Sequence, residues 1–231
     1  YGTVSRGVCH VKEDKLTDIH ETLKIALLPD GRIWDQTADA ELAVLPQLFG
    51  IDSRLVQFDQ LLRLVTLSDG RRVDSRCYEA FEEMMAACRD AGYAPFLCSA
   101  YRTQETQQSL YDNKVQRLMN SGMGEEEAKV EAAKAVAIPG TSEHQLGLAV
   151  DIVDANMQDL TDEQENTETQ KWLMANSWRY GFIHRYPNDK TDITGIIYEP
   201  WHYRYVGKAA AQDIFNRDIT LEEYVGKTNQ S

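Results

Sequence analysis

The segment from Leu146 to Val153 constrains the fold most, because it is an apolar run of strand length that contains one carboxylate, Asp151. An unpaired carboxylate inside a buried strand is costly in free energy, so Asp151 needs a partner. His144 stands just before the same run. Histidine nitrogen and aspartate oxygen are ordinary zinc ligands, and two ligands fixed by one strand need little reordering to bind. The segment therefore predicts a buried strand that carries part of a metal site.

A second cluster lies at Tyr198–His202, where Pro200 biases Glu199 away from helical backbone angles and stiffens an extended or turning segment. His202 is the candidate third ligand. Glu199, which backbone geometry keeps off the metal, is the candidate general base for a metal-bound water. Three protein ligands and a water make the open site that zinc hydrolysis requires. Taken alone, either cluster is more often an ordinary core or surface histidine than a metal ligand.

The rest of the chain alternates long helical patterns with isolated strand patterns. Helices are expected at 75–92, 103–121, 125–136 and 167–180, with capping boxes at Thr167 and, in a helical tail, at Thr220. Strands are expected at 61–67, 93–100, 146–153 and 193–206. Because the spacing of these elements is irregular, the pattern favours an α+β fold over a regular βαβ series.

Composition excludes several classes of partner. The 231 residues include 24 Lys and Arg against 37 Asp and Glu, which gives a formal net charge of −13. Nucleic acids and anionic membranes both require a positive face, so we expect neither as a partner. No apolar run approaches the roughly 18 to 20 residues of a membrane span. The 42% of hydrophobic residues is enough for a real core.

The cysteines and the N-terminal region carry weaker signals. Cys9, Cys77, Cys88 and Cys98 are too few for a disulfide scaffold and lack the spacing of a structural zinc site, so their redox state stays open. The first part of the chain shows no sustained period. We therefore expect an N-terminal extension of unknown role at 1–55 and one catalytic domain at 56–231.

Three motifs in order give a more specific indication. They are Ser-Ala-Tyr-Arg ending at Arg102, Ser-x-His-x-x-Gly-x-Ala-x-Asp from Ser142 to Asp151, and Tyr-Glu-Pro-Trp-His-Tyr-Arg-Tyr-Val-Gly from Tyr198. Together they resemble the VanY-type D-alanyl-D-alanine carboxypeptidases, zinc peptidases of bacterial cell-wall metabolism related to L,D-carboxypeptidases and to hedgehog-like folds. The likeness runs from about Leu61 to Tyr224. It implies a small antiparallel sheet flanked by helices, which agrees with the α+β pattern.

The resemblance also implies a role for each matching residue. Zn²⁺ would be held by His144, Asp151 and His202. Glu199 would activate water and later protonate the leaving amine, while Arg102 would stabilise the tetrahedral oxyanion. From the residues alone, Arg102 could equally form a structural ion pair. Substrate contacts are implied for Ser142, Gln107 and Trp201.

Alternatives remain within and outside this class. The same motifs fit an L,D-carboxypeptidase acting on tetrapeptide stems, and a binding module could keep the zinc fold without cleaving. A cysteine peptidase using Cys98 lacks an adjacent histidine in the sequence. We expect His184 to be structural or at the surface, and His10 and His20 to be ordinary surface residues.

The expected partner is a peptidoglycan stem peptide, which lies outside the cytoplasm. We therefore expect an extracytoplasmic protein, in the cell wall or anchored to the membrane through a segment upstream of Tyr1. The sequence leaves the oligomeric state open.

Overall fold

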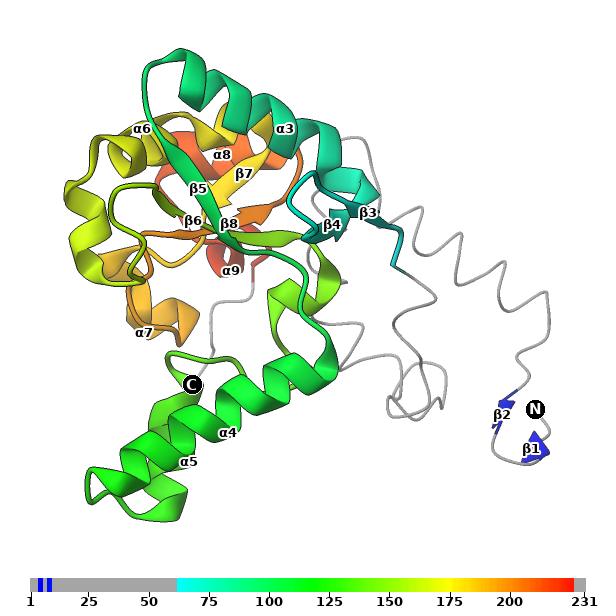
Figure 1. The fold of residues 1–231 in the computed structure, drawn as a ribbon, viewed down its shortest axis with the longest axis vertical. Helices are drawn as coiled ribbons and strands as arrows, with labels where there is room; N and C mark the ends of the chain where they lie inside the picture. Colours follow the sequence, from blue (N-terminus) through cyan, green and yellow to red (C-terminus); the bar gives the residue numbers. More distant parts are fainter. Residues whose placement is uncertain (1–3, 6–7, 10–61, 227–231) are drawn as a thin grey trace. The chain divides into compact units, whose positions relative to one another are not determined.

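The computed structural model describes residues 4–5, 8–9 and 62–226 (Figure 1). The chain divides into two units, Tyr1–Leu62 and Arg63–Ser231. In the first unit, strands β1 (Val4–Ser5) and β2 (Val8–Cys9) pair antiparallel. Most of the expected extension at 1–55, with His10 and His20, lies outside the described residues, so that expectation stays a prediction.

The second unit is built on a four-stranded antiparallel sheet. Its order is β5 (Pro95–Ser99), β6 (Ala149–Asp154), β8 (His202–Tyr205) and β7 (Phe182–His184) (Figure 1). A separate hairpin joins β3 (Leu64–Thr66) to β4 (Arg72–Asp74). The expected fold class, a small antiparallel sheet flanked by helices, is confirmed.

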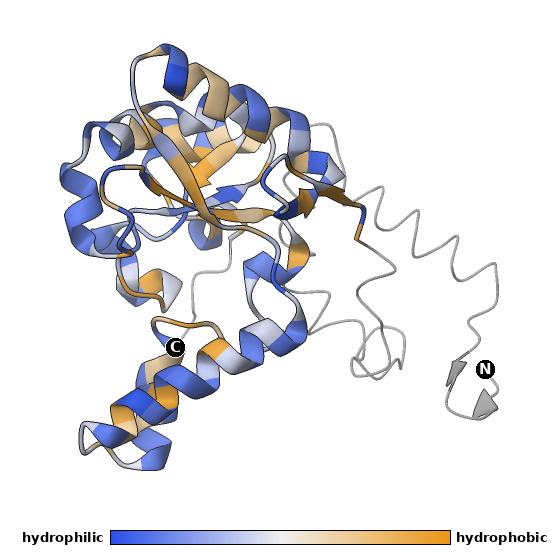
Figure 2. Cartoon of the chain, viewed as in Figure 1, coloured by the Kyte–Doolittle hydropathy of each residue, from blue (hydrophilic) through white to orange (hydrophobic). Residues whose placement is uncertain are grey.

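Helices α3 (Ser75–Asp90), α6 (Glu168–Asn176) and α8 (Lys208–Arg217) pack on the sheet and contact β5, β6 and β7 respectively. Apolar residues concentrate in the strands, whereas the helices carry many hydrophilic residues (Figure 2). No helix in 62–226 is long and apolar enough to cross a membrane.

Helices α4 (Gln104–Asn120) and α5 (Glu125–Ala133) form a hairpin that extends away from the sheet (Figure 1). The hairpin has its own small core of Val115, Ala128 and Ala132. The remaining helical segments within 62–226 are short. They are η3 (Glu143–Leu146), η4 (Asp162–Asn166), η5 (Ser177–Tyr180), η6 (Asn188–Lys190), α7 (Thr191–Thr194) and α9 (Leu221–Tyr224).

Side-chain caps start several helices where the sequence predicts them. The Asp74 carboxylate accepts from the backbone N–H of Arg76, and the Thr103 hydroxyl accepts from that of Thr106. Thr220 and Glu223 complete the capping box of α9. A polar oxygen at this position satisfies an N–H that has no partner within the helix.

Three local predictions need correction. Residues 193–206 are extended only in β8, and Thr191–Thr194 are helical. The buried strand begins at Ala149, because the short helix η3 occupies the residues before it. At Thr167 only the hydroxyl half of the capping box forms, since the Gln170 side chain instead donates to Ile152 O and accepts from the Tyr203 hydroxyl.

Gly147 connects η3 to β6 in a left-handed conformation with φ +67°. Its N–H donates to His144 O at 3.1 Å, and its carbonyl oxygen accepts from Asp74 N at 2.9 Å. A Cβ at this position would lie 2.9 Å from the backbone nitrogen of Asp74. The turn that places His144 therefore requires glycine for two reasons, the positive φ and the close backbone approach.

This close approach predicts a larger cost for Gly147→Ala than for Gly195→Ala. Gly195 has a similar φ of +73°, but a Cβ added there would have no atom within 4 Å and would face open space. The control should lose about 1–2 kcal/mol of unfolding free energy from left-handed strain, and Gly147→Ala should lose clearly more. Urea denaturation measures both, and equal losses would contradict the packing argument.

Candidate active site

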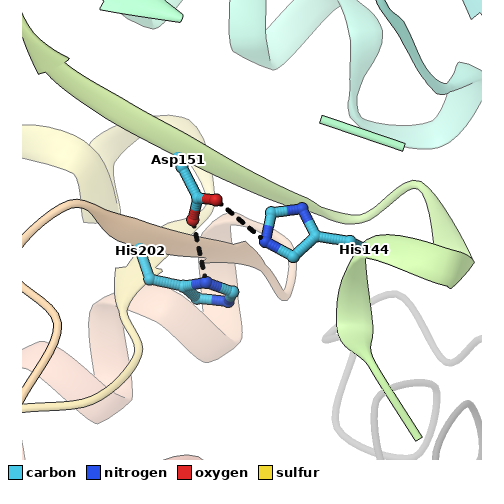
Figure 3. Close-up of side chains that lie close together, drawn as sticks. All are labelled: His144, Asp151 and His202. Carbon is cyan, nitrogen blue, oxygen red and sulfur yellow. Dashed lines mark hydrogen bonds and ion pairs between the residues drawn. The ribbon is translucent and has the colours of Figure 1, made fainter. Parts of the chain in front are cut away.

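Asp151 and His202 are brought together by the sheet. They lie directly opposite each other on the antiparallel strands β6 and β8, so their side chains share one face. His144 reaches the same point from η3 (Figure 3). All three side chains are buried, and one potential ligand atom from each lies within 4.8 Å of the others.

The two imidazoles approach Asp151 through different nitrogens. His144 Nε2 lies 3.2 Å from Asp151 Oδ2, and His202 Nδ1 lies 3.1 Å from Asp151 Oδ1 (Figure 3). The other nitrogen of each ring faces an acceptor. His144 Nδ1 is 2.8 Å from Ala100 O, and His202 Nε2 is 3.3 Å from the Glu143 carboxylate. Since these acceptors favour a proton on the outer nitrogens, the inner nitrogens are available as ligands.

The ionisation of this cluster fits a divalent cation. Burial lowers the pKa of His144. Burial also acts to lower the pKa of His202, but hydrogen bonds to Asp151 and Glu143 outweigh it and raise the pKa to about 9. Burial acts to raise the pKa of Asp151, yet the two histidines and Arg102 hold it well below its usual value. A cation that displaces the His202 proton would meet two neutral nitrogens and one carboxylate, an ordinary zinc donor set.

Arg102 follows β5 and lies at the edge of this cluster. Its guanidinium Nη2 is 2.7 Å from Asp151 Oδ2, and its Nε donates to the Ser99 hydroxyl at 2.9 Å. Its backbone N–H donates to His144 O at 3.1 Å. The structural ion pair considered for Arg102 is thus present, and its partner is a candidate metal ligand.

Glu199 is a carboxylate outside the ligand set that lies on the Nδ1 side of His202. Its Oε2 lies 3.6 Å from His202 Nδ1, and the side chain is buried. Burial is the main cause that raises its pKa to about 7, and the Asp151 charge adds to the rise, while His202 and Arg102 oppose it. A carboxyl group with a pKa near neutrality can both accept and return a proton, which suits a general base.

The backbone of Glu199 is held by β7 and by the residues that follow this strand. Its N–H donates to Tyr186 O at 3.2 Å, and its carbonyl oxygen lies 3.2 Å from His184 Nε2. Burial lowers the pKa of His184 to about 4, so this ring is neutral and donates to the carbonyl. His184 therefore acts in the structure as a support for the Glu199 segment.

The three expected substrate contacts lie in different surroundings. Ser142 is buried and is the N-cap residue of η3. Trp201, which directly precedes His202, is also buried, and its carbonyl oxygen accepts from Ile152 N at 2.9 Å. Gln107 lies in α4, fully buried, with its amide nitrogen donating to Ala137 O at 2.7 Å. Contact with a substrate stays a prediction for all three.

Sequence reasoning missed Glu143, Arg185 and Arg204, which are buried beside His202. The sequence does contain a signal for this group, because Arg204 is a charged residue between two tyrosines, Tyr203 and Tyr205. A charge buried in such a strand requires a partner, as the charge of Asp151 does. Glu143, which directly precedes His144, is that partner.

The described cysteines do not support a nucleophile. Cys77, Cys88 and Cys98 are free thiols. Burial, followed by the Asp151 charge, raises the pKa of Cys98, whereas a reactive cysteine needs a lowered pKa. The structure therefore disfavours the cysteine peptidase alternative.

A buried His–Asp–His set, with an arginine and a carboxylate of raised pKa beside it, is typical of a metal-dependent hydrolase. Comparison with known families is more specific. The family model described as "VanY: D-alanyl-D-alanine carboxypeptidase" matches residues 70–208. The chain belongs to this family, so the resemblance seen in the sequence is confirmed.

Individual relatives agree with this assignment. A D-alanyl-D-alanine carboxypeptidase of Enterococcus faecalis is 47% identical over 169 residues, which are 73% of this chain and 60% of the enterococcal protein. A single-residue mutant of a vancomycin resistance D,D-pentapeptidase VanY, in complex with Zn(II), is 46% identical with a TM-score of 0.66, covering 73% of this chain and 91% of that one. The LdcB LD-carboxypeptidase is 38% identical with a TM-score of 0.61, covering 71% and 73%.

These relatives bear directly on the predicted fold and cofactor. Both structures share the architecture described above, which confirms the D,D-peptidase-like fold. The predicted cofactor, zinc, is bound in the VanY structure, and this chain provides a His–Asp–His set that could hold a metal ion.

Proposed function

We propose that this chain is a zinc-dependent carboxypeptidase that removes the terminal D-Ala from peptidoglycan stem peptides. The observation that carries the proposal is the convergence of His144 Nε2, Asp151 and His202 Nδ1 on one point beside Glu199. Membership of the VanY family supports the same substrate class. Because stem peptides lie outside the cytoplasm, the proposal places the activity there.

In this proposal His144, Asp151 and His202 hold the zinc ion. Zinc supplies a Lewis acid that polarises a carbonyl oxygen and acidifies water. Glu199 takes a proton from the attacking water at its carboxylate and returns it to the leaving amine.

Arg102 has a separate electrostatic role in the proposal. Its side chain is 18% exposed and its guanidinium pairs with Asp151 at the edge of the cluster, so Arg102 can face both the cluster and a bound peptide. A fixed cation there stabilises the negative charge that develops on the carbonyl oxygen. The presence of both Glu199 and Arg102 favours an enzyme over a binding module that keeps only the metal.

Recognition of a free C-terminus is assigned to Ser142 and Gln107, with Trp201 as a wall of the pocket. A serine hydroxyl and a glutamine amide can both donate to a carboxylate. The Gln107 amide nitrogen has two N–H groups, and one donates to Ala137 O. The proposal assigns the second N–H to the substrate carboxylate, while Oε1 of the same amide is buried without a hydrogen-bond partner.

Stem peptides with defined ends test this function. The chain should release D-Ala from a pentapeptide ending in a free D-Ala-D-Ala, as read by mass analysis of the products. Amidation of the terminal carboxylate should lower kcat/KM about tenfold or more, because buried donors are left unpaired. Equal cleavage of free and amidated peptides would overturn the assignment of the carboxylate contacts.

A tetrapeptide stem separates the two activities found among the relatives. We favour the D,D-activity because the identity to the VanY structure, 46%, exceeds the 38% to LdcB. Release of D-Ala from tetrapeptides alone would assign the chain to the L,D-carboxypeptidases instead.

A further inference from the structure

A buried group of charges lies behind His202, on the side of the ring away from Asp151. The Glu143 carboxylate is 3.3 Å from His202 Nε2, 2.7 Å from Arg185 Nε and 3.1 Å from Arg204 Nη1. The two guanidinium groups face Oε1 of Glu143, which leaves Oε2 as the acceptor for the outer N–H of His202.

The group continues to the C-terminal helix α9. Arg185 binds Glu222 through two hydrogen bonds, Nη1 to Oε2 at 2.9 Å and Nη2 to Oε1 at 2.6 Å. Glu222 is on α9, which is held by the capping box of Thr220 and Glu223 and by the buried side chain of Leu221. Consecutive contacts thus join α9 to the candidate metal ligand His202 through Arg185 and Glu143.

Burying such a group of charges costs free energy of folding unless each charge has a partner of opposite sign. Two buried arginines and two carboxylates balance in charge, but desolvation of buried ions commonly cancels the gain from pairing them. Stability alone therefore gives a weak reason for this arrangement. A carboxylate that accepts from the outer nitrogen of a ligating histidine fixes the orientation and tautomer of the ring and makes the inner nitrogen a better ligand.

We propose that Glu143 is the positioning residue for His202, and that α9 supports it through the Glu222–Arg185 contact so that the C-terminal helix sets the metal affinity of the site. The inference rests on the ligand assignment made under the proposed function. It concerns metal binding and requires no particular peptide substrate.

Glu143→Gln tests the role of Glu143, because an amide cannot accept hydrogen bonds from the two arginines and from His202 at the same time. If its NH₂ faces Arg185 and Arg204, donors meet donors. If the NH₂ faces His202, Nε2 must accept, and the proton moves to Nδ1, the nitrogen needed for the metal. We expect zinc affinity, measured against a competing chelator, to fall about 10- to 100-fold.

A spectroscopic readout separates positioning from a general loss of structure. In wild-type protein loaded with zinc, the ¹⁵N shifts of His202 should report a protonated Nε2 and a ligating Nδ1, and circular dichroism should confirm that the variant is folded. A folded Glu143→Gln protein with wild-type zinc affinity and the same His202 shifts would overturn the role of Glu143.

Glu222→Gln tests the second part at a distance from the ligands. Its side chain is 22% exposed, so this variant should fold even if Glu143→Gln does not. We expect zinc affinity to fall about 2- to 30-fold, the range of coupling energies for residues that touch neither site.

Glu223→Ala is the matched control. It removes half of the capping box of the same helix without touching Arg185. Zinc affinity should stay at the wild-type value while the free energy of unfolding falls. An equal loss of zinc affinity in both α9 variants, or no loss in Glu222→Gln, would overturn the proposed contribution of the helix. Failure of the wild-type protein to release D-Ala would contradict the proposed function but leave these affinities unchanged.

Discussion

Glu199→Gln is expected to lower kcat by at least about 10²- to 10⁴-fold, the contribution typical of a general acid–base group. The amide keeps the size and most of the polarity of the carboxyl group but cannot accept the proton from water. Because Glu199 is not one of the three ligand residues, one zinc ion per chain should remain bound. The measurement is steady-state kinetics together with metal content of the same preparation.

Glu165→Gln is a suitable control for this variant. The exposed Glu165 accepts from the Tyr198 hydroxyl at 2.9 Å, so the substitution removes a carboxylate that contacts the same segment without reaching His202. Its kcat should stay near the wild-type value. Near-normal turnover of Glu199→Gln with full zinc would move the base elsewhere, and loss of zinc would make Glu199 a support for the metal.

Removal of zinc is expected to abolish turnover and to lower thermal stability. The buried donors His144, Asp151 and His202 bind the ion only when the chain is folded, so zinc stabilises the folded state by mass action. At free zinc about 1,000-fold above the dissociation constant, this stabilisation is about 4 kcal/mol. Chelator titration with activity and melting temperature as readouts measures both effects, and added zinc should restore them.

Asp151→Asn controls for other effects of the chelator, because it removes the one carboxylate of the ligand set. Its melting temperature should not respond to zinc. Elemental analysis that finds no transition metal in active wild-type protein would falsify the metal assignment.

Much of the site is visible in the sequence because its signals are local. A carboxylate within an apolar strand requires a partner wherever the strand lies, and that argument alone singles out Asp151. His144 and Asp151 belong to one short segment, as do Glu199 and His202. Their convergence follows from the pairing of β6 with β8, which the separate motifs do not specify.

The predictions that were wrong or incomplete depend on distant contacts. Gln170 leaves the capping box because Ile152 O and the Tyr203 hydroxyl, both outside its own helix, bind its side chain. Glu143 directly precedes His144, but the sequence does not indicate its role, because its partners Arg185 and Arg204 come much later in the chain. Short segments are equally ambiguous, and the single turn of α7 is too brief to show helical periodicity.

The location of the metal tests the account most directly. Crystals of the zinc-loaded protein, measured on both sides of the zinc absorption edge, would show the ion by its anomalous scattering. We predict one strong peak about 2.0–2.2 Å from His144 Nε2, an Asp151 oxygen and His202 Nδ1, with the Glu199 carboxylate outside the ligand set. A peak elsewhere in the chain, or zinc bound through Glu199 or through Nε2 of His202, would contradict it.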